Sequence, residues 1–233
     1  MKYLCIKCIQ EEINTPPHMD IYLSSNTVNA AWMAHYGGID GIIWAQLANE
    51  LVPGITMGIL PDIVLDRNNP PTAIKGDAYH EMAHASHFMK VGLFWWNHLT
   101  SYEVGQIMSN PDQDPYGNGT DPDAGYCAVA ESWANHIGAS FSISDPKIID
   151  KIYMENDFIP NGLHWDLNDA INDDEFFLVN DVVGGFTNEM IFDLLNSTSI
   201  DVLKVRLWNE HGADAGIIGS HADYNDLFLS YGY

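Results

Sequence analysis

The stretch DAYHEMAHASHFMKVG, residues 77–92, combines a helical pattern with three histidines and a glutamate inside eight positions. Its apolar residues recur at the spacing of one helix face: Ala78, Met82, Ala85 and Met89. Gly92 stands where a glycine commonly ends a helix. The sequence therefore predicts a helix over 76–92, and its histidines and glutamate suggest the chemistry.

His80, Glu81 and His84 form the pattern HExxH. Residues four apart share a helix face, so both imidazoles can bind one ion, while Glu81 is rotated by about 100° and lies beside it. Two neutral imidazoles, a third protein ligand and a water are typical of catalytic Zn²⁺, which lowers the pKa of that water to about 7. Glu81 can then accept its proton as a general base. The alternative is a histidine-rich helix that holds no metal.

A second helical pattern, over 124–142, offers the third ligand. Glu131 has alanine neighbours that would let another helix approach closely, and Asn135 lies one turn beyond it on the same face. We expect Asn135 to hydrogen-bond a ligating imidazole. The competing third ligands are Cys127, Glu103 and His136.

This arrangement of HExxH followed by a glutamate on a later helix resembles the gluzincin zinc metallopeptidases, of which thermolysin-like enzymes are members. The resemblance covers the two helices. It implies a zincin-like fold, a peptide or protein substrate, His80, His84 and Glu131 as zinc ligands, and Glu81 as general base. Asn135 stands where those enzymes carry an aspartate. Metzincins are excluded, because His87 and Lys90 occupy the positions where they need glycine and a third histidine.

Length and pattern predict one α+β domain over 1–233. Residues 1–75 would be strand-rich and form a small N-terminal sheet, and residues 76–233 would be mainly helical. The run 57–66 is predicted as a strand whose edge could hold an extended peptide. A loop over 109–125 separates the first two helices, and two further helices are expected from Thr187 and Ser199.

Charge limits the partners. Nine Lys and Arg against 32 Asp and Glu leave a net charge of −23, which would repel nucleic acid and anionic lipid. No run approaches the roughly 18 apolar residues of a membrane span. No signal peptide is visible, so we expect either an exported or cell-envelope protein whose signal is missing from this chain, or a cytoplasmic one. Cys5 and Cys8 form a CxxC without a second pair.

Two further features leave alternatives open. The loop has acidic residues and glycine at several calcium-loop offsets, a weak match to a Ca²⁺ site: Asp112, Asp114, Gly117, Asn118 and Asp123. The donor that would stabilise an oxyanion has several candidates: His221, Tyr224 and Tyr126, with His164 and His211 as rivals. The sequence favours a zinc metallopeptidase, and the alternative function is a catalytically inactive, metal-containing binding module of the cell envelope.

Overall fold

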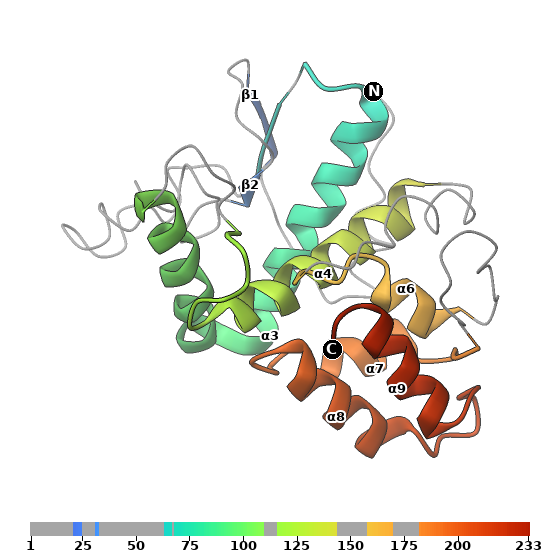
Figure 1. The fold of residues 1–233 in the computed structure, drawn as a ribbon. Coiled ribbons are helices and arrows are strands. Elements are labelled where there is room, and N and C mark those ends of the chain that lie inside the picture. Colours follow the sequence, from blue (N-terminus) through green and yellow to red (C-terminus); the bar gives the residue numbers. More distant parts are fainter. Residues whose placement is uncertain are drawn as a thin grey trace.

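The structure, a computed structural model, describes residues 21–24, 31–32, 63–66, 68–109, 116–143, 158–169 and 182–233. Figure 1 shows the elements in chain order. The strands are β1 (Ile21–Ser24), β2 (Ala31–Trp32) and β3 (Ile63–Asp66). The helices are α3 (Pro71–Ser109), α4 (Ala124–Ser142), α6 (Leu163–Asn168), α7 (Asn188–Asp193), α8 (Ile200–His211) and α9 (His221–Ser230).

The described part of the chain is mainly helical, so the α+β class predicted from the sequence is wrong. Its strands contain four, two and four residues, whereas α3 alone has 39 residues and α4 has 19. The expectation of a strand-rich segment over 1–75 came from short apolar runs between turn formers, a pattern that identifies secondary structure poorly. Most of that segment lies outside the described residues.

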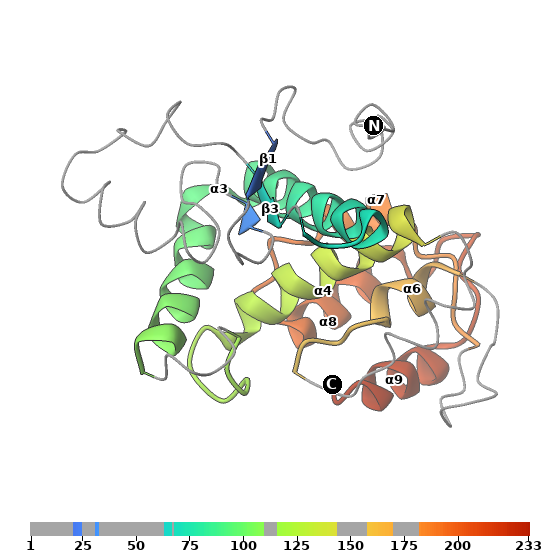
Figure 2. The ribbon, with the colours of Figure 1, turned by 90° about the horizontal axis from the view of Figure 1, so that it is seen from above.

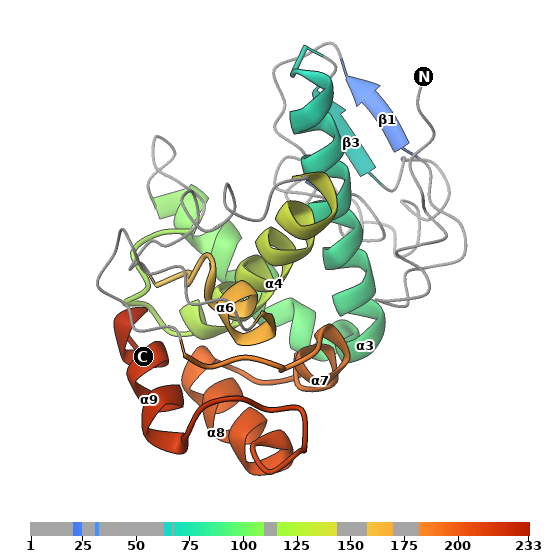
Figure 3. The same ribbon diagram turned by 90° about the vertical axis from the view of Figure 1, so that its right-hand side faces the viewer.

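The predicted strand at 57–66 is described only as β3. Strand order is β1-β3-β2, with β1 parallel and β2 antiparallel to β3. The described part of the predicted strand, Ile63–Asp66, therefore has a neighbour on each side and does not offer the free edge that was predicted for a peptide. Figure 3 shows β1 and β3 beside the first half of α3. Ile63 and Leu65 are buried there, which fixes the sheet to the helix.

Helix α3 begins before the predicted helix and continues beyond Gly92, where the sequence predicted its end. Gly92 has φ 75° and ψ 177°, a conformation that kinks the helix and that only glycine adopts freely. The chain then resumes a helix up to Ser109. Its second half buries Trp95 and Trp96, and the Nε1–H of Trp95 donates to the carbonyl of Ser197 at 3.1 Å.

Helix α4 lies at the centre of the molecule, between α3 and α8 in Figure 2. It is buried on nearly every side, with every residue from 127 to 134 in the interior. A helix whose side chains are mostly small and apolar on every face suits a buried, central position. The predicted bounds 124–142 are confirmed.

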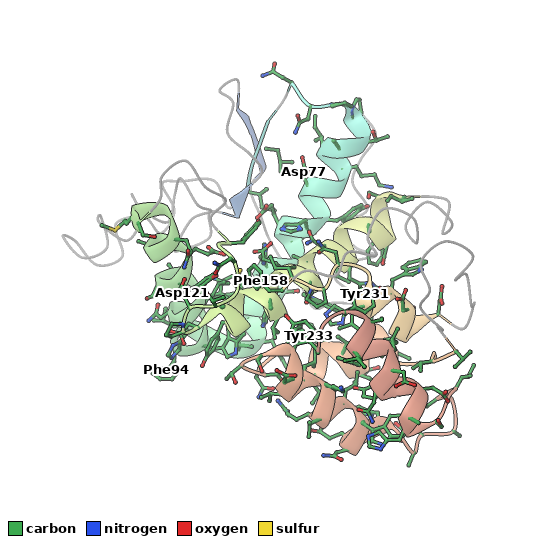
Figure 4. The ribbon with its side chains drawn as sticks, viewed as in Figure 1. Asp77, Phe94, Asp121, Phe158, Tyr231 and Tyr233 are labelled. Atoms are coloured by element: carbon green, nitrogen blue, oxygen red, sulfur yellow. The ribbon has the colours of Figure 1, made fainter. Side chains whose placement is uncertain are left out.

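The C-terminal helices begin at the predicted caps. Thr187 and Ser199 accept hydrogen bonds from the backbone of Met190 and Val202, and so cap α7 and α8. The chain end packs over α6, where the hydroxyl of Tyr231 donates to Asp166 (Figure 4). Within the described ranges, no helix is both long enough and apolar enough to cross a membrane.

Candidate metal centre

The candidate metal centre forms where the first half of α3 crosses α4. These two helices pack together more extensively than any other described pair. Gly138 of α4 makes the close approach possible: a Cβ at this position would lie 3.2 Å from both the Cβ of His80 and the carbonyl oxygen of Gly76. Small residues at the crossing thus bring the α3 histidines against the α4 glutamate.

His80, His84 and Glu131 converge at this crossing. The two Nε2 atoms lie 3.0 Å apart. Nε2 of His80 is 3.4 Å from Oε2 of Glu131, and Nε2 of His84 is 3.3 Å from Oε1. Together these side chains can hold one metal ion. The spacing predicted from HExxH and the later helix thus brings the three predicted ligands together.

The atoms of this triad also fit an ion chemically. Three ligand atoms at zinc's usual bond lengths in a tetrahedral arrangement would lie about 3.3–3.4 Å apart. Here one ligand atom from each residue lies within 4.8 Å of the others, so small shifts of the side chains would bring them to one ion. Glu131 is only 4% exposed, and its Oε2, 3.4 Å from Nε2 of His80, makes no hydrogen bond of good geometry among the described residues. A buried carboxylate oxygen without a hydrogen bond is costly, and coordination of a cation would satisfy it.

The charges within the triad depend on one another. Burial alone would lower the pKa of His80, but the Glu131 carboxylate raises it to about 9. Burial alone would raise the pKa of Glu131, but the His84 and His80 imidazoles hold it far below its usual range. In the absence of an ion, the site therefore keeps a proton on an imidazole, which an incoming metal must displace.

Glu81 lies beside the triad, as the helical rotation predicts. Its side chain is 5% exposed, and it lines, with His80, an open pocket of about 600 Å³ between α3 and α4. A carboxylate here can accept a proton from a molecule bound in the pocket.

Tyr116 lines the same pocket, a position that the sequence did not predict. Its backbone carbonyl accepts a hydrogen bond from the hydroxyl of Tyr102 at 2.5 Å, which ties this end of the loop to α3. The charge of Glu131, followed by burial and the charges of Glu103 and Glu81, raises the pKa of Tyr116 well above its ordinary value. The phenol therefore keeps its proton and is a donor. Its place in a Pro- and Gly-rich loop gave no signal of this contact.

Glu103, on the second half of α3, is a buried acid near the triad but is not part of it. Burial, followed by the charges of Glu131 and Glu81, raises its pKa well above the ordinary range. Burial beside these two acids thus favours the neutral form of Glu103, which disfavours it as a metal ligand.

The other candidate ligands point elsewhere. Cys127 is fully buried and is absent from the ligand group. Nε2 of His136 lies 2.8 Å from Oδ1 of Asn188. Asn135 lines the pocket, but its amide donates to Oδ1 of Asn161 at 2.6 Å. Among the described residues, Asn135 therefore hydrogen-bonds Asn161 and not the ligating imidazole that was expected.

The predicted oxyanion donors lie away from the pocket. The ring of His221 stacks on Trp208, and the hydroxyl of Tyr224 donates to the carbonyl of Lys204. Tyr126 stacks on His98, at a centroid distance of 4.6 Å. Each of these residues has a structural contact of its own, and none lines the pocket beside Glu81.

Several remaining predictions concern other parts of the chain. His87 packs against Trp95 and Trp96, and its Nε2–H donates to the carbonyl of Leu195 at 2.8 Å. In the loop, Asp123 pairs with His98, and Oδ1 of Asn118 accepts from Thr120. Asp112, Asp114, Cys5 and Cys8 lie outside the described residues, so the calcium and CxxC predictions remain untested.

Comparisons with protein-family models, with curated proteins and with solved structures found no match to this chain. The similarity to gluzincins thus stays a prediction from two helices. The site is a largely buried His–His–Glu group that can hold a metal ion beside an open pocket.

Proposed function

We propose that the protein is a zinc-dependent metallopeptidase in which His80, His84 and Glu131 hold one Zn²⁺. The observation that carries this proposal is the convergence of two imidazole nitrogens and a carboxylate within 3.4 Å of one another, beside a pocket that Glu81 lines. Two nitrogens and one oxygen suit zinc better than calcium or magnesium, which prefer oxygen ligands.

A bound zinc ion would supply positive charge that acidifies a water molecule and polarises a substrate carbonyl. The protein's own groups do the rest. Glu81 accepts the proton of the attacking water and delivers it to the leaving amine. The phenol of Tyr116 donates a hydrogen bond to the oxygen that becomes negative as the carbonyl is attacked. The α3–α4 crossing keeps Glu81 and the triad in place before substrate binds, and the hydrogen bond from Tyr102 holds the backbone of Tyr116.

The test compares wild type with Glu81→Gln and with the control Glu210→Gln, an exposed position on α8. Each protein is purified without a His-tag and loaded with zinc, and cleavage of a peptide library is followed by mass spectrometry. Glu81→Gln should bind zinc as wild type does and lose at least about 10²-fold of the cleavage rate, because the general base is gone. Glu210→Gln should cleave normally.

Three results would contradict the proposal. Cleavage by Glu81→Gln at the wild-type rate would reject the base. Zinc bound without turnover of any peptide would favour a catalytically inactive, metal-containing binding module. Absence of bound metal from the wild type would mean that the HExxH pattern arose by chance.

A further inference from the structure

The pocket beside the triad has a second carboxylate that the proposed chemistry does not use. Asp77 lies on α3, three residues before His80 and four before Glu81, and all three line the pocket. Figure 4 labels Asp77 on the first half of α3. On a helix these spacings correspond to about 4.5–6 Å along the axis, so Asp77 lies roughly one turn from the catalytic groups.

This carboxylate is half-buried and has little to balance its charge. The Nδ2 of Asn69 donates to its Oδ2 at 3.3 Å. Burial raises its pKa, although Asn69 and His80 counteract part of that rise. Removing a carboxylate from water without a cationic partner is unfavourable.

Lysine and arginine side chains do not fill this role among the residues that the structure describes, where His80 is the group whose charge acts on Asp77. Lysine and arginine are absent from the described pocket lining. Lys75, the lysine nearest in sequence, places its ammonium 5.6 Å from the ring centre of Tyr79. Lys90 forms an ion pair with Asp193, and Arg206 forms one with Glu210. Among the described residues, the positive charge that acts on Asp77 comes from His80, and an organic cation bound in the pocket would add to it.

We propose that this pocket binds an organic cation of the peptide substrate, an ammonium or guanidinium group, with Asp77 as the specificity-determining residue. The inference rests on the proposed peptidase function. One helical turn between Asp77 and Glu81 places the cation about one residue from the bond being cut. A lysine or arginine side chain and a free N-terminal amine share this chemistry. The net charge of −23 would also attract cationic peptides.

The test uses zinc-loaded full-length protein and four peptides that differ in one position or one end. Two are acetylated and carry either lysine or its neutral counterpart norleucine next to the scissile bond, a third replaces lysine by glutamate, and the fourth has norleucine and a free amine. Wild type should prefer the lysine or the free-amine peptide over acetylated norleucine by about tenfold in kcat/KM, the value of one charge-assisted hydrogen bond. Which of the two is preferred identifies the source of the cation.

The variant Asp77→Asn should abolish that preference, so that the lysine and the acetylated norleucine peptides have equal kcat/KM. Asp201→Asn, which removes the same charge from an exposed position on α8, should retain the preference. Thermal unfolding checks that both variants are folded, and Asp77→Glu should restore part of the preference if Asn is poorly tolerated.

Binding separates this inference from the peptidase proposal. Fluorescence anisotropy with zinc-loaded Glu81→Gln should show the same preference for the cationic peptide without any cleavage, and the preference should weaken at high salt. Equal binding and cleavage of charged and neutral peptides, or an unchanged preference in Asp77→Asn, would overturn the inference while the peptidase stands. Selective binding without turnover in wild type would reject the peptidase and retain the cation site.

Discussion

Gly138 lies against His80 so closely that a Cβ on the glycine would be 3.2 Å from the Cβ of the histidine. Gly138 lies on α4, the helix that carries Glu131, and its contact with α3 sets the position of His80. Because interior packing tolerates little added volume, the metal centre depends on a residue that contributes no ligand atom.

Gly138→Ala should therefore weaken zinc binding by about tenfold, since His80 must move by a few tenths of an ångström to admit the new methyl group. Competition with a chelating dye measures the affinity. Gly105→Ala is the control, because nothing lies within 4 Å of a Cβ at that position. Equal affinities in both variants would show that the crossing does not position His80.

Tyr116→Phe should lower kcat by about 10²-fold with little change in KM or zinc content, because its hydroxyl would act on charge that develops during the reaction. Tyr126→Phe removes the same atom from a tyrosine outside the pocket and should leave kcat unchanged. The assignment fails if Tyr126→Phe is the variant that loses activity.

Zinc should stabilise the folded protein, because an unfolded chain does not preserve the triad. At 100 times the dissociation constant the gain is about 2.7 kcal/mol, which corresponds to about 5–10 °C in the unfolding temperature of a domain of this size. Calorimetry with and without a chelator measures it. A chelator that leaves the unfolding temperature unchanged would contradict metal binding by the folded state.

Acid should destabilise the protein partly through His164. Burial, followed by the charge of His136, lowers the pKa of His164 from 6.5 to about 3. Between these values the unfolded state binds a proton that the folded state excludes, so the free energy of unfolding falls as pH decreases below about 6.5. Above that pH the effect disappears.

His164→Leu should remove this dependence, reducing the pH slope of the unfolding free energy by about 1.4 kcal/mol per pH unit between pH 6 and 4. Urea denaturation at several pH values measures the slope in each protein. The comparison concerns slopes, so a uniform loss from the missing contact with Ser132 does not affect it. Parallel slopes would show that His164 titrates normally.

The two helices of the candidate site could be predicted because their signals are local. Helical spacing places His80 and His84 on one face, and the small residues around Glu131 indicate a helix that packs closely. Both follow from neighbours within a few positions in the sequence.

What could not be predicted depends on contacts distant in sequence or on backbone conformation. Gly92 can either end a helix or kink it, and only packing of the following tryptophans decides that the helix resumes. Asn135 donates a hydrogen bond to Asn161, which is 26 positions away in the sequence. Tyr116 reaches the pocket from a loop whose composition indicates only irregular structure.

Zinc content tests the central claim most directly. Elemental analysis of tag-free wild type, Glu131→Gln and Glu103→Gln compares the same substitution at two buried acids, each 4% exposed, of which only Glu131 belongs to the triad. We predict one zinc per chain in wild type and Glu103→Gln and little in Glu131→Gln. A wild type without zinc, or a Glu131→Gln variant that retains it fully, would contradict the assignment.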